Sequence, residues 1–210
     1  MNIGTIGTGR MASALAALWA AIGHGLVLGS RDPAGARARL TLHDPGIRIG
    51  TVPEAVAFGD VVLVATPWSA GRDAIRAGGS FEGKILIDCM NPIVRDAAGL
   101  HTGMGSDTSA AEQVARWAIG ARVFKAFNSI YWETLGNPRF GTQIATCFYC
   151  GEDGEAKESV ARLVRETGFE AVDAGPLSSA RFLEPLALLW IQLASERGMV
   201  NDIAIKLIRR

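Results

Sequence analysis

The sequence of 210 residues has no excess of charge of either sign, because 21 lysines and arginines balance 21 aspartates and glutamates. A balanced chain lacks the basic surface through which proteins bind nucleic acids or anionic membranes, so we expect neither partner. Long apolar runs are also absent: the densest one, residues 186–193, contains Gln192 and is far too short to span a bilayer. No cleavable signal precedes the first predicted strand, and we expect a cytoplasmic protein.

Cysteine is scarce, and an odd number of three argues against a disulfide framework. Cys147 and Cys150 have the spacing of a redox pair or of half a zinc site. They lie, however, in the predicted strand 144–150, where residues three apart point to opposite faces, and the sequence has no second pair. We therefore expect buried cysteines and no metal site.

Histidine is equally scarce, and its positions suggest no acid–base site. His24, His43 and His101 all fall in predicted loops or turns without a partner visible in the sequence. A general acid or base has to be within hydrogen-bond reach of the proton it moves. We therefore assign no catalytic residue.

The sequence does contain a strand, a tight turn and a helix at its very start. The first apolar run leads into Gly7 and Gly9, and an Ala/Leu-rich helix is predicted over residues 11–22. Gly7 permits the sharp bend, Gly9 lets the backbone approach a pyrophosphate, and Ala12 lets helix and strand pack closely. The pyrophosphate would bind the free N–H groups of the helix N-terminus. A glycine pattern alone is weak, but its position between strand and helix favours dinucleotide binding over a purely structural turn.

The end of the second predicted strand, residues 26–29, indicates which dinucleotide is bound. A dinucleotide fold meets the adenine ribose about twenty residues after the glycine turn, and an NAD site places Asp or Glu there. This chain has Ser30 and Arg31, a donor and a fixed cation suited to a 2′-phosphate. Asp32, followed by Pro33, is interpreted as the N-cap of the next helix. We therefore expect NADP(H); the alternative is an incidental surface arginine.

Two further predicted strands, 60–65 and 84–88, end near a proline at the sheet edge where ligands of α/β proteins bind. Their exits carry the remaining candidate cofactor contacts: Thr66, Pro67 and Trp68 after the first, and Asn91 and Pro92 after the second. Trp68 either lines the nicotinamide end or simply packs. Asn91 either hydrogen-bonds the nicotinamide ribose or carboxamide, or forms a turn. The sequence leaves both alternatives open.

Strands and helices alternate along the first part of the chain, which indicates an α/β fold with a Rossmann-type doubly wound parallel sheet. We place an NADP-binding domain at residues 1–122 and a small C-terminal α+β extension at residues 123–210. The elements expected late in the chain are a glycine-rich loop at 99–107, a helix at 109–118, strands at 122–127, 144–150 and 170–173, helices at 155–167 and 178–198, and a last strand at 202–208. The helix at 178–198 is apolar nearly all round, which predicts burial under the sheet or in a subunit contact, and Pro185 is expected to kink it or mark its first turn.

With these segments in hand, the chain resembles the NADP oxidoreductases that serve coenzyme F420, a deazaflavin carrier. The resemblance covers essentially the full length and is most specific at Asp173-Ala174-Gly175-Pro176-Leu177 and Leu183-Glu184-Pro185-Leu186-Ala187. It also includes Gly7-Thr8-Gly9, Gly29-Ser30-Arg31, Thr66-Pro67-Trp68, Asn91-Pro92 and Lys125-Ala126-Phe127-Asn128.

The resemblance implies a homodimer in which hydride passes directly between nicotinamide and deazaflavin, in a cleft between the main domain and the extension. It places Thr8, Gly9, Arg10 and Met11 at the pyrophosphate, and the end of the second strand at the 2′-phosphate. Two stacked rings need proximity, orientation and exclusion of water more than a proton donor, which accounts for the missing acid–base site.

Three positions remain to be assigned within this resemblance. A second basic residue that can assist Arg31 is absent near Gly35, and Arg37 is the substitute that the sequence offers. Glu184 is interpreted as having a helix-end or interface role rather than a chemical one. The small-molecule acceptor itself stays open: coenzyme F420, or a flavin, quinone, imine or other small acceptor, or none at all in an NADP-binding sensor.

Overall fold

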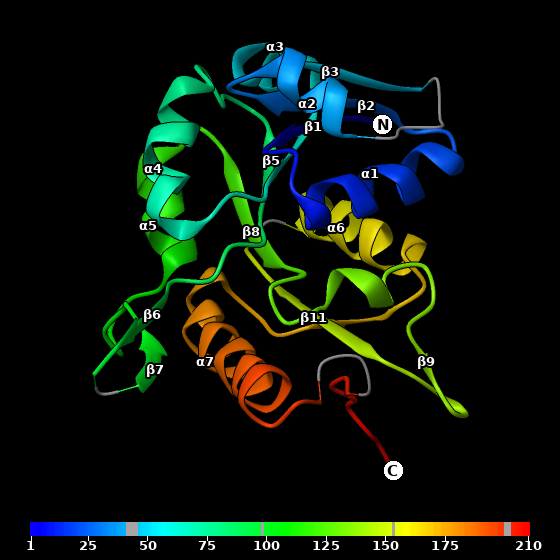
Figure 1. Ribbon diagram of the computed structural model, residues 1–210, viewed down its shortest axis with the longest axis vertical. Helices are drawn as coiled ribbons and strands as arrows, with labels where there is room; N and C mark the ends of the chain where they lie inside the picture. The colour runs from blue at the N-terminus through cyan, green and yellow to red at the C-terminus, as the bar shows by residue number, and fades with distance from the viewer. Residues whose placement is uncertain (41–45, 98, 153, 200–202) are drawn as a thin grey trace.

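The computed structural model describes residues 1–40, 46–97, 99–152, 154–199 and 203–210. Its centre is an eight-stranded sheet in the order β12-β11-β8-β5-β4-β1-β2-β3 (Figure 1). The strands are β1 (Asn2–Ile6), β2 (Gly25–Ser30), β3 (Ile47–Thr51), β4 (Val61–Val64), β5 (Ile85–Asp88), β8 (Arg122–Ala126), β11 (Thr146–Cys150) and β12 (Glu170–Asp173). Neighbouring strands pair in parallel, except β11 with β8.

Helices cover both faces of this sheet, which confirms the predicted doubly wound α/β fold. They are α1 (Arg10–Ala21), α2 (Pro33–Arg39), α3 (Val52–Phe58), α4 (Trp68–Ala77), α5 (Ala110–Trp117), α6 (Gly154–Glu166) and α7 (Ala180–Ile191), with short turns η1 (Trp132–Thr134), η2 (Leu177–Ser179) and η3 (Gln192–Glu196). One apolar cluster joins α1 and α6 to the sheet, and a second joins α3, α4 and α5 to its other face. Burial on both faces is the reason that β4 is apolar at every position.

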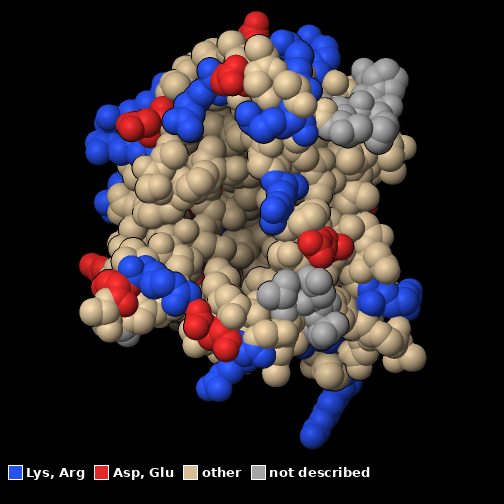
Figure 2. All heavy atoms as spheres, viewed as in Figure 1, with Lys and Arg blue, Asp and Glu red and all other residues tan. Residues whose placement is uncertain are grey.

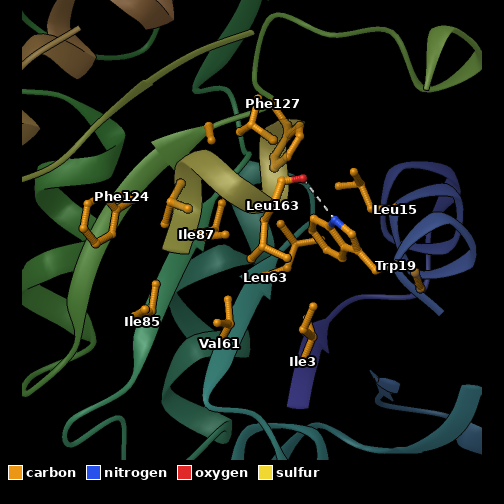
Figure 3. Close-up of a cluster of buried hydrophobic side chains, with 14 of the residues drawn as sticks. Ile3, Leu15, Trp19, Val61, Leu63, Ile85, Ile87, Phe124, Phe127 and Leu163 are labelled. Atoms are coloured by element: carbon orange, nitrogen blue, oxygen red, sulfur yellow. Dashed lines mark hydrogen bonds between the residues drawn. The ribbon is translucent and has the colours of Figure 1, made fainter. Parts of the chain in front are cut away.

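The first cluster contains Trp19, a fully buried side chain of α1. Its indole N–H donates to the carbonyl oxygen of Leu163 in α6 at 3.2 Å, and its ring meets Phe127 edge to face at 5.9 Å (Figure 3). A buried indole needs such a partner, because an unpaired N–H in a core costs about 1–3 kcal/mol. Trp19 therefore holds α6 against α1, the first helix of the chain.

Side-chain caps set where three of the helices begin. Asp32 accepts from the backbone N–H of Gly35 at 2.9 Å and Ser109 from that of Glu112 at 3.2 Å. Thr51 forms a reciprocal capping box at the start of α3. The predicted N-cap role of Asp32 is confirmed, and Pro33 occupies the first turn of α2, as expected from its fixed φ.

The C-terminal part extends the main sheet. Strands β11 and β12 add to it beyond β8, so a single sheet crosses the division placed between residues 122 and 123, which falls inside β8. The extension as a separate unit stays a prediction. In the part of the chain that the structure describes, no helix is long and apolar enough to cross a membrane.

Two of the expected segments, one loop and one strand, were wrong. The glycine-rich loop begins as a strand, because β7 (Gly99–Thr102) pairs with β6 (Ile93–Asp96) in a small antiparallel hairpin. Both strands lack a fully buried residue, which is why no apolar alternation marks them. For the last expected strand, residue 202 lies outside the described residues and 203–208 form no strand. Thr146 donates from its N–H to the Ile205 carbonyl, but Leu207 then donates to the Thr146 hydroxyl, so no ladder continues.

The expected helix over 178–198 is shorter and only partly covered. It is divided into η2, α7 and η3, and Pro185 lies inside α7 rather than in its first turn. Leu183, Glu184 and Ala187 are buried on one side of α7, whereas Phe182 is 75% exposed. The structure therefore leaves one apolar side of this helix uncovered.

Candidate functional site

A cleft of about 820 Å³ opens at the carboxyl ends of β1, β2 and β4. This is the edge of an open α/β sheet at which ligands bind. Its lining residues are Ile6, Gly7, Thr8, Gly9, Gly29, Ser30, Arg31, Asp32, Arg39, Val52, Ala65, Thr66, Pro67, Ser69, Ala70, Asp73, Ala74 and Ala77. The structure thus brings together seven of the twelve candidate residues; Arg10, Met11, Trp68, Asn91 and Pro92 are outside this lining.

The glycine turn between β1 and α1 forms one end of the cleft. Gly7 has φ +116°, and a Cβ there would lie 2.5 Å from the Ala65 carbonyl oxygen, so only glycine fits. A Cβ at Gly9 would meet no atom within 4 Å, which leaves open space beside the backbone. Within the part of the chain that the structure describes, no side chain caps the N-terminus of α1. Its first N–H groups are therefore available to an anion from solvent, in the direction that the helix dipole favours.

The other end of the cleft is formed where β2 turns into α2. The Ser30 hydroxyl accepts from the Asp32 N–H at 3.1 Å and donates to the Asp32 carbonyl at 3.0 Å, which fixes the turn. The Asp32 carboxylate is engaged as the helix cap. In the described turn after β2, the one carboxylate near the usual ribose-binding position of an NAD site is thus already used as a helix cap.

Two guanidinium groups line this end of the cleft, and they are Arg31 and Arg39. Among the described residues, neither makes a hydrogen bond or an ion pair. Arg37, the substitute expected from the sequence, instead donates to the Ile49 carbonyl at 2.5 Å and lines a separate hollow. Arg39, which the sequence analysis missed, is thus the second cation of the cleft.

Gly35 explains why this second cation comes from one turn later in the helix. A Cβ at Gly35 would lie 2.1 Å from Oδ2 of Asp32 and 3.4 Å from Nη1 of Arg39. A side chain at this position, basic or not, would force the Asp32 carboxylate to shift. Glycine at residue 35 therefore keeps the cap and leaves room for the Arg39 guanidinium beside it.

At the exits of β4 and β5, the side chains of Trp68 and Asn91 contact neighbouring elements of the fold. Trp68 stacks on Trp117 of α5 with ring centroids 5.1 Å apart, and it is half-buried. Asn91 donates to the Asn128 carbonyl at 2.7 Å and accepts from the Asn128 side-chain amide at 3.2 Å. Both side chains therefore join neighbouring elements, and Pro92 is buried beside them.

The side chains of Arg10 and Met11, which are also outside the cleft lining, contact other parts of the protein. Met11 packs against the first apolar cluster. The Arg10 guanidinium lies over the ring of Trp132, 5.4 Å from its centroid. Figure 2 shows a hollow in the middle of this face, between α4, the start of α1 and β8 in the view of Figure 1.

Beyond these candidates, the structure contains a buried ionic network that the sequence analysis missed. Lys125 of β8 lies 2.8 Å from Asp88 of β5 and 3.0 Å from Glu184 of α7, and also donates to the Met90 carbonyl at 2.7 Å. All three charged side chains are 97–100% buried. A lysine within the apolar run of β8 is the signal that could have found it, because such a residue needs a buried partner.

Glu184 has the helix-end role that the sequence suggested, but at another helix. Its two carboxylate oxygens accept from the N–H groups of Ala110 and Ala111, the first residues of α5, at 2.9 and 3.2 Å. The partial positive charge of that helix end compensates the second carboxylate of the network. Burial alone would lower the pKa of Lys125, but Asp88 and Glu184 outweigh it and raise the pKa above the ordinary value. The lysine is therefore a charged structural group.

The cysteines behave as expected from the strand. Cys147 and Cys150 are buried and free, and burial raises the pKa of each thiol to about 12. Such thiols are poor nucleophiles and poor metal ligands. Within the described ranges, no group of three His, Cys, Asp or Glu side chains could hold a metal ion.

Comparison with known proteins agrees with this geometry. The family model described as "NADP oxidoreductase coenzyme F420-dependent" matches residues 2–92. The F420-dependent NADP reductase of Methanothermobacter thermautotrophicus is 30% identical over 228 residues, which cover 99% of this chain and 94% of that protein. The crystal structure of a candidate F420-dependent NADP reductase from Arthrobacter sp. FB24 superposes with a TM-score of 0.89 and 28% identity, over 99% of both chains.

A relative of different length also matches. Metalloreductase STEAP3 of Rattus norvegicus is 32% identical over 191 residues, which cover 90% of this chain. The chain spans 37% of the length of that protein.

Proposed function

Because this chain belongs to the family of coenzyme F420-dependent NADP oxidoreductases, we propose that it transfers hydride between NADP(H) and coenzyme F420 or a similar small acceptor. The observation that carries the choice of nucleotide is the pair of guanidinium groups, Arg31 and Arg39, which have no partner among the described residues and line the cleft that begins at the glycine turn. Two fixed cations at this position suit the two charges of a 2′-phosphate.

Different residues of the cleft bind different parts of the nucleotide. Gly7, Thr8 and Gly9, with the backbone N–H groups of Arg10 and Met11, bind the pyrophosphate at the start of α1. At the other end, Ser30, Arg31 and Arg39 bind the adenosine 2′-phosphate.

At the nicotinamide end, Thr66 and Pro67 contact the cofactor directly. Trp68, Asn91 and Pro92 support that end from behind, through the Trp117 stack and the Asn128 hydrogen bonds. When bound, NADPH supplies the hydride, so the protein has to orient the ring and exclude water rather than provide an acid or base.

The test is anaerobic NADPH oxidation with F420 as acceptor, run beside free FMN, a control without acceptor, and NADH. Rapid turnover with NADPH and F420 is the expected result. Turnover with FMN alone would move the acceptor to a flavin. NADPH binding without reduction of either acceptor would contradict the proposed activity and favour a sensor of the nucleotide.

We also propose that the protein forms a homodimer through α7. The exposed residues Phe182, Leu189 and Leu193 recur at spacings of seven and four and so share one side of the helical segment. Their exposed fractions are 75%, 55% and 36%, and a row of exposed apolar side chains is typical of a contact between subunits.

Light scattering tests the dimer. The wild type is expected to give twice the mass of one chain, and Phe182→Asp is expected to give a monomer. A monomeric wild type at all concentrations would contradict the dimer.

A further inference from the structure

An aromatic group from three separate segments lies beside the start of α1. The Trp132 and Tyr131 rings have centroids 5.8 Å apart, and Tyr131 is in turn 5.8 Å from Trp190 of α7, at an interplanar angle of 28°. The Arg10 guanidinium completes the group over the Trp132 ring. We call these four residues the ring-and-cation group.

The group is open to solvent, in contrast to the aromatic residues of the core. Trp132, Tyr131 and Trp190 are each half-buried, and Arg10 is exposed. Among the described residues, the Arg10 side chain makes no ion pair or hydrogen bond; it lies over the Trp132 ring, and its charge also acts on the nearby Tyr131. A planar guanidinium that lies over one ring still has a second face and five N–H donors that can meet another planar group.

The location connects this group to the proposed reaction. Arg10 directly follows the glycine turn and is the first residue of α1, so its side chain starts at the helix end that is proposed to bind the pyrophosphate. α1 starts at the edge of the hollow in Figure 2, and α7, which carries Trp190, belongs to the extension that borders the same face in Figure 1. The Arg10 guanidinium therefore lies between the nucleotide cleft and α7.

We infer that the ring-and-cation group is the acceptor subsite and takes a planar heteroaromatic ring, which stacks on the Arg10 guanidinium opposite Trp132. This inference rests on the proposed hydride transfer. Arg10 also supplies N–H donors to oxygen atoms at the edge of that ring. The geometry thereby assigns the Arg10 side chain to the acceptor, while its backbone N–H stays with the nucleotide. A ring-shaped substrate class follows, rather than a metal complex or an aliphatic imine.

The test uses the full chain loaded with NADP⁺ and two ring probes, oxidised F420 and oxidised FMN. The variants are Arg10→Met and Trp132→Leu. Arg165→Met on α6, an exposed arginine paired with Glu158, serves as the matched control. Two constants are measured for each protein: the Kd for NADPH from its fluorescence, and the Kd for the ring probe from quenching of tryptophan fluorescence.

Both variants are expected to weaken ring binding by about tenfold, the effect of one lost aromatic or cation contact. Their NADPH affinity should change less than their ring affinity, because both substitutions keep the backbone N–H groups at the start of α1 that are proposed to bind the pyrophosphate. Arg165→Met should change neither constant. Arg10→Lys, which keeps the charge but not the planar group, should recover only part of the lost affinity.

Three results would overturn the inference. One is weaker NADPH binding with unchanged ring binding, because Arg10 would then belong to the nucleotide. Another is ring binding that neither variant changes, and the third is a wild type that binds neither probe. A wild type that binds a ring through Arg10 and Trp132 but does not reduce it would leave the subsite intact and contradict the proposed activity alone.

Discussion

Two sets of charged residues at the ends of strands in the same sheet differ in almost every respect. Where β2 turns into α2, Arg31 and Arg39 line a cleft without any partner among the described residues. Near the end of β8, Lys125 is fully buried and held by Asp88 at the end of β5, by Glu184, by a backbone carbonyl and, through Glu184, by a helix N-terminus. Both sets contain cations beside the nucleotide-binding edge, but only one of them offers its charge to a ligand.

This difference shows how to separate binding residues from supporting ones in such a fold. A guanidinium in water needs no protein partner, so leaving it unpaired costs little and keeps its donors free for an anion. A buried ammonium would be very unfavourable without its carboxylates, and its donors are fully used. A shifted pKa used as the only criterion would have selected Lys125 as the functional residue. Counting the hydrogen-bond and ion-pair partners of each cation among the described residues selects Arg31 and Arg39 instead.

The largest expected effect comes from breaking the buried set. Lys125→Met leaves Asp88 and Glu184 buried without their cation, and we expect a loss of about 3–5 kcal/mol in the free energy of unfolding. Urea denaturation followed by circular dichroism measures it. Lys157→Met, which breaks the more exposed pair with Asp173, is the control and should cost about 0–1 kcal/mol. Equal losses in the two variants would mean that the buried network is no more important than a surface pair.

The second prediction concerns the open set. Arg39→Ala should lower the ratio of kcat/KM for NADPH over NADH by about tenfold, the effect of losing one charge-assisted hydrogen bond of about 1.5 kcal/mol. Arg37→Ala is the matched control on the same helix, because its guanidinium donates to Ile49 outside the cleft. If Arg37→Ala reduced the NADPH preference and Arg39→Ala did not, the assignment of the second cation would be reversed.

A third, smaller effect should appear at low pH, where a half-exposed pair links α5 to α7. Arg181 makes a two-pronged contact with Glu112 at 2.7 and 2.9 Å, and this contact lowers the pKa of Glu112 below its ordinary value. A lowered folded-state pKa gives stability that is present above the ordinary value of 4.5 and is lost as pH falls through the folded-state value. Glu112→Gln should cost about 0.5–1 kcal/mol at pH 7, discounted for exposure, and less at pH 3. Thermal unfolding at the two pH values measures this, and a larger loss at pH 3 would contradict it.

The smallest expected effect concerns the buried thiols. It is an effect on the rate at which they react near neutral pH rather than on the stability of the fold. Because burial raises the pKa of Cys147 and Cys150 to about 12, both should react slowly with a thiol reagent at pH 8 and rapidly in denaturant. A raised thiol pKa favours the folded state only below the ordinary value, so its contribution should decline as pH rises above 9.0. Because Cys89 is less buried, the labelled positions are identified by peptide mass spectrometry, and rapid labelling of Cys147 or Cys150 in the native protein at pH 8 would contradict their burial.

Local patterns predicted most of the fold and seven of the eighteen residues that line the cleft. The turn at Gly7, the Asp32 cap and the Ser30–Arg31 pair depend on residues within one strand–turn–helix unit, so their sequence spacing is sufficient to find them. The β6–β7 hairpin gave no signal because neither strand buries a side chain fully.

The remaining parts depend on contacts between distant segments. The choice between Arg37 and Arg39 depends on which side of a seven-residue helix faces the cleft, and this side is fixed by packing against β3. The Lys125 network joins residues 88, 125 and 184, and the ring-and-cation group joins residues 10, 131, 132 and 190. Such groups form only when the sheet is assembled, so no spacing in the sequence reveals them.

The most direct test of hydride transfer from the cleft is an isotope experiment. NADPH carrying two deuterium atoms at the hydride-donating carbon is mixed anaerobically with the protein and oxidised F420, and the reduced acceptor is analysed by mass spectrometry. Direct transfer between two bound rings predicts one deuterium on the acceptor ring, with NADP⁺ formed in equal amount. Reduced acceptor without deuterium, or deuterated NADPH that stays unoxidised, would contradict the account.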